Sequence, residues 1–358
     1  MEKNFTKDGL ILLNKSKGVS SFGAINHLKK VMKAKKVGHA GTLDPMAEGL
    51  MIVMINEATK FSDNLMKKDK EYYVEMELGY KTDTYDLEGT VIAKYDSEIN
   101  ISDSEIIKAV NSFKGKIKQV PPMYSAIKIE GQKLYDLARK GIEVERAERN
   151  VEISEIREIK VIRPDKNSEN AQNIKISFYV KVSSGTYIRS LVYDIGEKLG
   201  VFATMTRLVR TKIGRFEIED AITLEKAKAE IDKLKNLMEG KTENESFWAT
   251  KNDSAIRAEK IREIVCFVEI EYVLDYYGIN VSNVKYGKLK NGMTVIDTFK
   301  KFENISKEAS KGANVRENQK FKIYVRNKNT NVREFKGIVK IVNIRGDRIY
   351  LKRDKYFL

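Results

Sequence analysis

Residues 38–45 read Gly-His-Ala-Gly-Thr-Leu-Asp-Pro, and Met-Ala-Glu-Gly-Leu follows at 46–50. Glycines let a chain turn sharply and approach a ligand closely, and Pro45 fixes the backbone directly after Asp44. The stretch therefore predicts a shaped loop that presents one carboxylate. By itself, such a loop is more often a structural turn in which the aspartate is a cap than a catalytic loop. The rest of the chain has to decide between these two interpretations.

The periodicity of apolar residues on both sides of this loop indicates a mixture of helices and strands. Residues 22–36 predict a basic amphipathic helix with Ser20 or Ser21 as its cap. Alternating or β-branched stretches predict strands at Tyr72–Leu78, Thr90–Ala93, Ile174–Val182 and Arg215–Glu219. Helical periodicity predicts further helices at Ser104–Phe113, Lys133–Lys140, Tyr187–Leu199 and 223–238. The fold class expected from this order is α+β.

Composition shifts along the chain predict three regions. A break is expected after the helix at 223–238, which gives a first domain over residues 1–238, with polar surface excursions at 93–103 and 163–173. A connecting helical segment is expected over 239–280, polar at 239–256 and helical at 256–278. Residues 281–358 predict a compact β domain, because short strands alternate with turns at Asn291-Gly292, Asn327–Asn331 and Arg345-Gly346-Asp347.

Cysteine and histidine are too scarce for several kinds of chemistry. The chain has 358 residues, 42% apolar and 33% charged, which is ordinary for a globular protein of two or three domains. Cys266 is the only cysteine, and His27 and His39 are the only histidines. An intrachain disulfide is excluded, no metal centre is expected, and a reducing cytoplasm fits better than secretion. We also expect neither a signal peptide nor a membrane span.

The positive charge is concentrated at the C-terminal end. The formal net charge is +15, and residues 281–358 carry 20 Lys and Arg against 7 Asp and Glu. Such a field favours a polyanion, and the Tyr, Phe and Arg residues interleaved with the lysines suit RNA better than a lipid surface. A lysine-rich surface typical of an AT-rich genome is the alternative explanation.

The loop at 38–45 resembles the active-site loop of the TruB-type tRNA pseudouridine synthases, bacterial enzymes that act on uridine 55 of the T-loop. Other motifs of that family occur in the family's order: Gly9–Lys15 with Gly18–Ser21, Tyr72 with Gly79–Gly89, Gln119–Lys128, and Ser183–Leu191. The resemblance extends over residues 9–220, and the order of separate motifs makes it specific. It implies a mixed, largely antiparallel-sheet catalytic domain, and it favours the catalytic interpretation of the loop.

Two positions depart from the family pattern. Ser16 stands where the family usually has proline, and Ala40 stands where it usually has threonine. Neither residue supplies the reacting group. These departures therefore affect the expected local geometry of the loop rather than the expected activity.

The resemblance assigns the central chemistry to Asp44, as either the nucleophile or the base that begins cleavage of the glycosidic bond. It implies Arg189 as the salt-bridge partner, which would keep Asp44 ionised in a site that excludes water. Tyr72 corresponds to the family's tyrosine, whose ring stacks on the uracil and whose hydroxyl could take part in proton transfer at C5. Tyr73 is the alternative, and Tyr72 is preferred because it lies seven positions before Gly79.

The resemblance also implies residues that hold the substrate. Leu208 corresponds to an apolar wall of the uracil pocket, although a leucine is in general a core residue. His39 has a role in RNA shape, because a uridine in a folded loop must be extruded before it reaches Asp44. His27, on the polar side of the first helix, is expected to be solvated.

The C-terminal region resembles the PUA-type RNA-binding barrel of these enzymes, through Leu289–Met293, Phe335–Val339 and Ile349–Arg353. Lys352 and Arg353, together with Lys15 near the N-terminus, are the RNA-binding residues that we expect. The resemblance implies that this region contacts the acceptor end of tRNA while the first domain contacts the T-arm.

The function expected is therefore isomerisation of uridine 55 of tRNA to pseudouridine by a cofactor-free, metal-free, monomeric and cytoplasmic enzyme. No DNA or membrane partner is expected. Two alternatives stay open. One is an RNA-binding or RNA-folding protein in which turnover is secondary, and the other is a dyskerin-type subunit that works with guide RNA.

Overall fold

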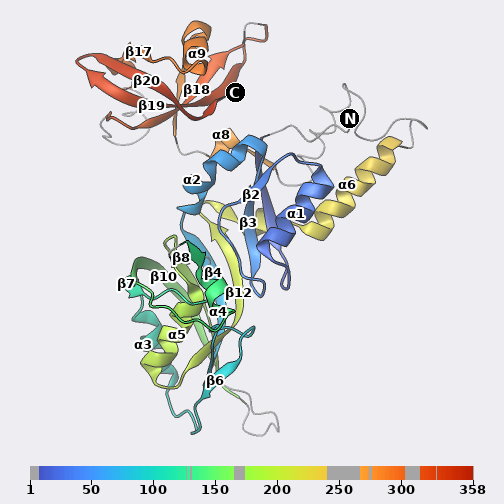
Figure 1. Ribbon diagram of the computed structural model, residues 1–358, viewed down its shortest axis with the longest axis vertical. Coiled ribbons are helices and arrows are strands. Elements are labelled where there is room, and N and C mark those ends of the chain that lie inside the picture. The colour runs from blue at the N-terminus through green and yellow to red at the C-terminus, as the bar shows by residue number, and fades with distance from the viewer. Residues whose placement is uncertain are drawn as a thin grey trace. The chain divides into compact units, whose positions relative to one another are not determined.

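The computed structural model describes residues 8–125, 127–129, 131–164, 174–239, 267–273, 276–302, 315–327 and 329–357 (Figure 1). The chain divides into two compact units. The first consists of Met1–Phe5, Ile11–Val53 and Ser62–Cys266, and the second of Thr6–Leu10, Met54–Phe61 and Phe267–Leu358. Each unit contains its own β-sheet.

The first unit is built on one large mixed sheet. Its strands run in the order β14-β1-β3-β12-β4-β11-β10-β7, and β2 and β13 pair with β3 and β12. The strands are β1 (Gly9–Lys15), β2 (Val37–His39), β3 (Glu48–Ile55), β4 (Lys70–Leu78), β7 (Gly115–Gln119), β10 (Arg149–Ile162), β11 (Lys175–Val182), β12 (Ala203–Ile213), β13 (Phe216–Glu217) and β14 (Ile222–Thr223). Two small hairpins lie apart from it: β5 (Tyr80–Thr82) with β6 (Val91–Lys94), and β8 (Lys128–Ile129) with β9 (Gln132–Lys133).

Antiparallel pairs dominate the centre of this sheet, as the resemblance implied. β4 runs antiparallel to both β11 and β12, with Tyr72 opposite Val180 on one side and Arg210 on the other. β12 pairs in parallel with β3, where Arg210 lies opposite Gly49. Because residues alternate between the two faces of a strand, Tyr72 and Val74 are buried while Tyr73 is partly exposed.

The helices of the first unit pack in pairs. They are α1 (Ser21–Met32), α2 (Ser62–Met66), α3 (Asp103–Asn111), α4 (Leu134–Ala138), α5 (Ile188–Leu199), α6 (Leu224–Glu239) and the 3₁₀ turn η2 (Ile218–Asp220). α1 lies beside α6, and α3 lies beside α5 (Figure 1). α5 also packs on β12 and β4, which places its first turn over the buried face of the central strands.

The second unit contains a five-stranded sheet in the order β16-β18-β19-β20-β17. Its elements are η1 (Asn56–Phe61), β15 (Phe267–Glu269), α8 (Ile270–Val273), β16 (Tyr277–Asn280), α9 (Asn283–Lys290), β17 (Val295–Thr298), β18 (Lys320–Arg326), β19 (Arg333–Arg345) and β20 (Arg348–Phe357). Phe302 and Phe321 meet edge to edge in its apolar core, with ring centroids 4.9 Å apart. Burial of alternate residues on one face of the sheet supplies the hydrophobic stabilisation of this unit.

Most predicted elements are present, with one clear error. Ser20 accepts a hydrogen bond from Gly23 N at the start of α1, so the predicted cap is confirmed. Within the described residues, the helix predicted over 256–278 is present only at Ile270–Val273, because Phe267–Glu269 and Tyr277–Asn280 are strands. β16 pairs in parallel with β18, and this tertiary pairing overrides the local helical pattern. Arg215–Glu219 is a strand only at Phe216–Glu217.

Other parts of the sequence-based description lie outside the described residues. These are 165–173 of the surface excursion at 163–173 and residues 240–266 of the connecting segment at 239–280. Within the part of the chain that is described, no helix combines the length and apolar character needed to cross a membrane.

Candidate active site

The loop that carries Asp44 connects β2 to β3. Ser21, the first residue of α1, is buried, and its hydroxyl donates to Leu43 O and accepts from Leu43 N, both at 2.8 Å. This pair of hydrogen bonds fixes the residue directly before Asp44. The Asp44 side chain itself is 36% exposed, so its carboxylate remains accessible to a ligand.

Arg210 on β12 supports the loop through hydrogen bonds to its backbone. Its side chain is buried, and it donates to Leu50 O (2.7 Å), Gly41 O (3.2 Å) and Thr42 O (3.4 Å). Gly49 is required beside it, because its φ is +104° and a Cβ there would lie 2.4 Å from Arg210 O. Arg210 was not among the residues predicted for the site; its place two residues after Leu208, on the same side of a strand, was the available signal.

Lys15 also supports the loop through hydrogen bonds to backbone carbonyls. Only 2% of Lys15 is exposed, and its ammonium donates to Val19 O (2.7 Å), Ser16 O (3.0 Å) and Pro45 O (3.3 Å). The assignment of Lys15 to RNA binding is therefore wrong, because all three donors serve the protein backbone. Burial lowers the pKa of Lys15 from 10.5 to about 8, against the opposing charge of Asp44.

Arg189 is the partner of Asp44. Its Nη2 lies 2.9 Å from Asp44 Oδ2, so the ion pair implied by the resemblance is present. The same nitrogen donates to Tyr124 O (2.7 Å), and Nη1 donates to Thr84 O (3.2 Å). Nε lies 3.5 Å from Asp86 Oδ2. Because the guanidinium is planar and engaged on every edge, it has a single orientation.

Gln119 fixes the start of α5, and therefore the position of Arg189. The Gln119 side chain is buried at the end of β7, where its amide donates to Tyr187 O (3.0 Å) and accepts from Tyr187 N (2.8 Å). Tyr187 makes no side-chain cap of its own. A neighbouring strand thus satisfies backbone groups that a helix start leaves open.

Asp86 is a further residue of the candidate site, and sequence analysis did not identify it. It is 1% exposed, and its Oδ1 accepts hydrogen bonds from Thr84 Oγ1 (2.6 Å) and Glu88 N (3.0 Å). Burial raises the pKa of Asp86, while the Thr84 hydrogen bond and the charge of Arg189 oppose that rise. Asp86 therefore gives the buried Arg189 a second carboxylate on the side away from Asp44.

Tyr72 and Leu208 lie on the buried face of the central strands. Tyr72 is 8% exposed on β4, across from Arg210, and Leu208 is 6% exposed on β12. The Tyr72 hydroxyl makes no hydrogen bond to a described residue, so it is available to a ligand. Tyr73 faces the other side of the sheet, where its ring centroid lies 5.1 Å from that of Tyr179. The preference for Tyr72 over Tyr73 agrees with this arrangement.

His39 ends β2 and is half-buried. Its Nδ1 is buried and has no hydrogen-bond partner among the described residues. Burial, and then the charge of Arg210, lower the pKa of His39 below 6.5, so the ring is neutral near pH 7. A neutral ring can accept or donate one hydrogen bond without adding charge.

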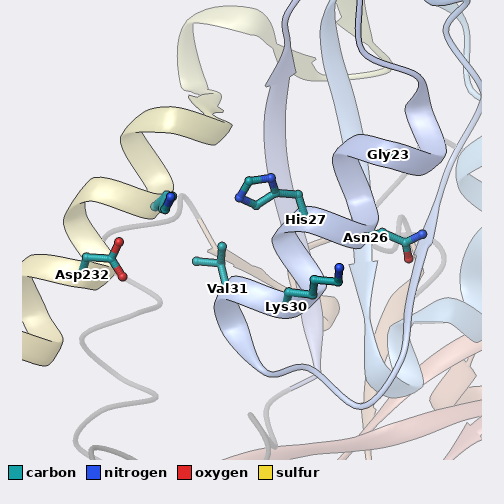
Figure 2. Close-up of a pocket in the computed structure, with 7 residues that line it drawn as sticks. Gly23, Asn26, His27, Lys30, Val31 and Asp232 are labelled. Atoms are coloured by element: carbon teal, nitrogen blue, oxygen red, sulfur yellow. The ribbon is translucent and has the colours of Figure 1, made fainter.

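The remaining sequence-predicted residues lie apart from Asp44. Lys352 and Arg353 are exposed on β20, and Arg353 Nη1 donates to Lys290 O at 2.7 Å. His27 is exposed and lines a groove of about 600 Å³ between α1 and α6 (Figure 2). Asp44, Arg189 and Tyr72 do not line this groove. Among the described residues, no cluster of three or more His, Cys, Asp or Glu side chains could hold a metal ion.

Comparisons with known proteins show the family of the chain. Residues 29–188 match the N-terminal domain of the TruB family of pseudouridylate synthases, and residues 189–258 match the C-terminal domain of tRNA pseudouridylate synthase B. The tRNA pseudouridine synthase B of Fusobacterium nucleatum is 50% identical over 212 residues, 59% of this chain and 70% of the relative. That of Clostridium perfringens strain 13 is 46% identical over 291 residues, 81% of this chain and 85% of the relative.

A solved structure supports the fold. The crystal structure of a Cbf5-Nop10-Gar1 complex superimposes with a TM-score of 0.62 at 23% identity, covering 98% of this chain and 85% of that chain. The large mixed sheet that carries the Arg189–Asp44 ion pair is thus a known fold. The chain belongs to the TruB family of pseudouridylate synthases, and it is an isomerase.

Replacing Asp86 tests its role behind Arg189. In Asp86→Asn the guanidinium loses one of its two carboxylates, and we expect the rate of pseudouridine formation to fall about a hundredfold because Asp44 is misplaced. The free energy of unfolding should fall by about 1–3 kcal/mol. Single-turnover kinetics and denaturant unfolding measure the two effects.

Asp103→Asn is the matched control, because it also removes a carboxylate from an arginine, in the exposed Asp103–Arg163 pair. It should change neither quantity appreciably. A normal rate for Asp86→Asn would show that Asp86 does not position the catalytic pair.

The lowered pKa of Lys15 gives a pH dependence. As pH rises through about 8, Lys15 loses the charge that binds Pro45 O, and we expect the rate of product formation to fall. Between pH 8 and 10.5 the unfolded chain binds the extra proton, so the contribution of Lys15 to the free energy of unfolding rises with pH. Activity should therefore decline without a loss of stability from this residue.

A pH–rate profile beside a pH–stability profile measures this. Lys15→Arg should keep its remaining activity to higher pH, because arginine stays protonated. If both proteins lose activity over the same pH range, another group is responsible.

Proposed function

We propose that this enzyme converts uridine to pseudouridine at position 55, in the T-loop of tRNA, and that Asp44 begins the reaction. The observation that carries this proposal is the ion pair between Arg189 and Asp44, in which a buried guanidinium holds an accessible carboxylate. The relatives named tRNA pseudouridine synthase B support tRNA as the substrate.

The reaction is an isomerisation and balances without an added reactant. The bond between C1′ and N1 of the target uridine breaks, the uracil turns, and a bond forms between C1′ and C5. C5 loses its proton and N1 gains one, so the composition of the nucleotide does not change. Asp44 acts either as a nucleophile or as the base that begins glycosidic cleavage.

The other site residues act on the uracil and on Asp44. Arg189 favours the charged form of Asp44 in a site that the substrate closes to water. The Tyr72 ring stacks on the uracil, and its free hydroxyl is available for the proton transfer at C5. Leu208, on the neighbouring strand, supplies an apolar wall.

His39 acts on the shape of the RNA. Extruding the target uridine costs roughly a few kcal/mol, and a ring that replaces a lost contact reduces this cost. The half-buried, neutral His39 exposes part of its ring for such a contact. It therefore holds the flipped arrangement rather than transferring protons.

The region at 281–358 is the second tRNA-binding element, a PUA-like barrel that contacts the acceptor end while the catalytic domain at 1–238 holds the T-arm. Its charge balance of 20 Lys and Arg against 7 Asp and Glu supports this role. Lys352 and Arg353 are exposed and can contact phosphates. We place the enzyme in the cytoplasm, as a monomer.

A guide-RNA-dependent enzyme is the second candidate, because the fold matches Cbf5 in its complex with Nop10 and Gar1. The two candidates differ in what the isolated protein does. Purified protein alone should form pseudouridine in an unmodified tRNA transcript if it is a stand-alone enzyme. Product that appears only after guide RNA or partner proteins are added would favour the second candidate.

Asp44→Asn tests the role of the aspartate. We expect no measurable pseudouridine and nearly unchanged tRNA affinity, because the amide is isosteric but is neither a nucleophile nor a base. Mapping of pseudouridine and filter binding measure these two quantities. Arg189→Lys is the companion variant, since it keeps the charge but cannot reach Asp44, Asp86 and two carbonyls at once. Lost tRNA affinity in Asp44→Asn would instead mark Asp44 as structural.

A double variant tests the second RNA-binding element. Lys352→Ala with Arg353→Ala should weaken tRNA binding and reduce the slope of log K against log salt by about 0.9 for each lost phosphate contact, with little effect on the single-turnover rate at saturating tRNA. The control is Lys118→Ala with Arg163→Ala, which removes two cations already paired with Glu148 and Asp103. Equal salt slopes for the two double variants would refute the docking role.

A further inference from the structure

The segment around the first helix is strongly basic, although the first 280 residues are nearly neutral as a whole. Residues 9–43 contain seven lysines and neither aspartate nor glutamate. Of these, Lys17, Lys29 and Lys30 form no ion pair with any residue in the described ranges. The protein therefore carries a second local field that favours a polyanion, apart from the one in its C-terminal region.

An exposed aromatic ring lies at the start of this segment. Phe22 is 68% exposed, and its ring makes no aromatic or cation–π contact with a described residue. Its backbone position is nevertheless fixed, because the preceding Ser21 is buried and bonded to both backbone groups of Leu43. The backbone of Phe22 therefore lies close to Leu43, the residue directly before Asp44.

The helix geometry places the Phe22 ring and Lys29 on one side of α1. Ile25, Leu28 and Met32 are buried, and Phe22 and Lys29, seven residues apart, share one flank of the helix beside this buried stripe. Asn26, His27 and Lys30 instead line the groove between α1 and α6, and Figure 2 shows His27 and Val31 on the side of α1 that faces α6. From Phe22 to Lys29 this ridge is about 10 Å long, at 1.5 Å per residue.

We propose that this ridge, Phe22 with Lys29, binds the RNA strand beside the target nucleotide, with a base stacked on Phe22 and a phosphate contacted by Lys29. This proposal rests on the proposed function, because it needs a flipped uridine at Asp44. When that uridine leaves its stack, a neighbouring base loses a stacking partner. The Phe22 ring, next to the catalytic loop, replaces that partner.

The chemistry of the ridge favours RNA over a protein partner. An aromatic ring followed by lysines is the combination that binds single-stranded nucleic acid, where every base offers a face for stacking. A protein partner of an apolar patch would need a larger contiguous apolar surface than one ring. Among the residues of α1, Phe22 has the only exposed apolar side chain.

Binding experiments test the stacking contact. They are made with full-length protein carrying Asp44→Asn, so that affinity is measured without turnover. Phe22→Ala should weaken binding of unmodified tRNA about tenfold, which corresponds to about 1.4 kcal/mol. Phe22→Tyr should stay within about twofold of the parent. Ile162→Ala is the matched control, since Ile162 is 58% exposed at the end of β10, and its affinity should not change.

Fluorescence tests contact with a base directly. The chain has one tryptophan, so Phe22→Trp adds one reporter, and stacking should quench it when tRNA binds. Ile162→Trp should show no such quenching. Lys29→Ala should lower the slope of log K against log salt by about 0.7, for one lost single-strand phosphate contact.

Failure of the ridge and failure of the proposed function are distinguishable. If the wild-type protein forms pseudouridine while Phe22→Ala binds tRNA as tightly as the parent and Phe22→Trp is not quenched, the ridge is refuted and the function stands. If the wild-type protein binds tRNA but forms no pseudouridine, the proposed function fails. The affinity of Phe22→Ala then still decides whether the ridge binds RNA.

Discussion

The buried guanidinium of Arg189 is the constraint on which the rest of the site depends. A charge in the protein interior is tolerated only where its hydrogen bonds are satisfied and a counter-charge is near. Arg189 meets this condition with two carboxylates and two backbone carbonyls from three separate segments. The segments around Thr84 and Tyr124 must therefore fold against α5 before Asp44 has its partner.

The loop that carries Asp44 depends on two further buried cations, which do not pair with its carboxylate. Lys15 and Arg210 donate only to backbone carbonyls of the loop and its neighbours, so they determine the shape of the chain near Asp44. Arg189 instead acts on the carboxylate. Different residues therefore fix the shape of the loop and pair with the Asp44 carboxylate. The lowered pKa of Lys15 reflects the free-energy cost of burying its charge.

The sequence was informative where local pattern and motif agree. α1, α3, α5, β4 and β11 were predicted because their apolar residues repeat at the period of a helix or a strand. β10 and β12 were not, because charged residues interrupt their alternation. Asp44 and Arg189 came from ordered motifs. Arg210, Asp86 and Gln119 act through contacts with residues distant in the chain, which no local pattern reveals. The burial of Lys15 was missed for the same reason.

The sequence separation between the Asp44 loop and Arg210 also has a consequence for the protein during its translation. Arg210 and the Gly41 carbonyl that it binds are 169 residues apart. At ordinary translation rates, on the order of ten seconds separate their appearance from the ribosome. For most of that interval the nascent chain carries Asp44 without Arg189, and throughout it without Arg210, so the aspartate has no arranged site around it. The arranged site therefore arises only after residue 210 of the 358 has been made, as a property of several distant segments together rather than of the segment that contains Asp44.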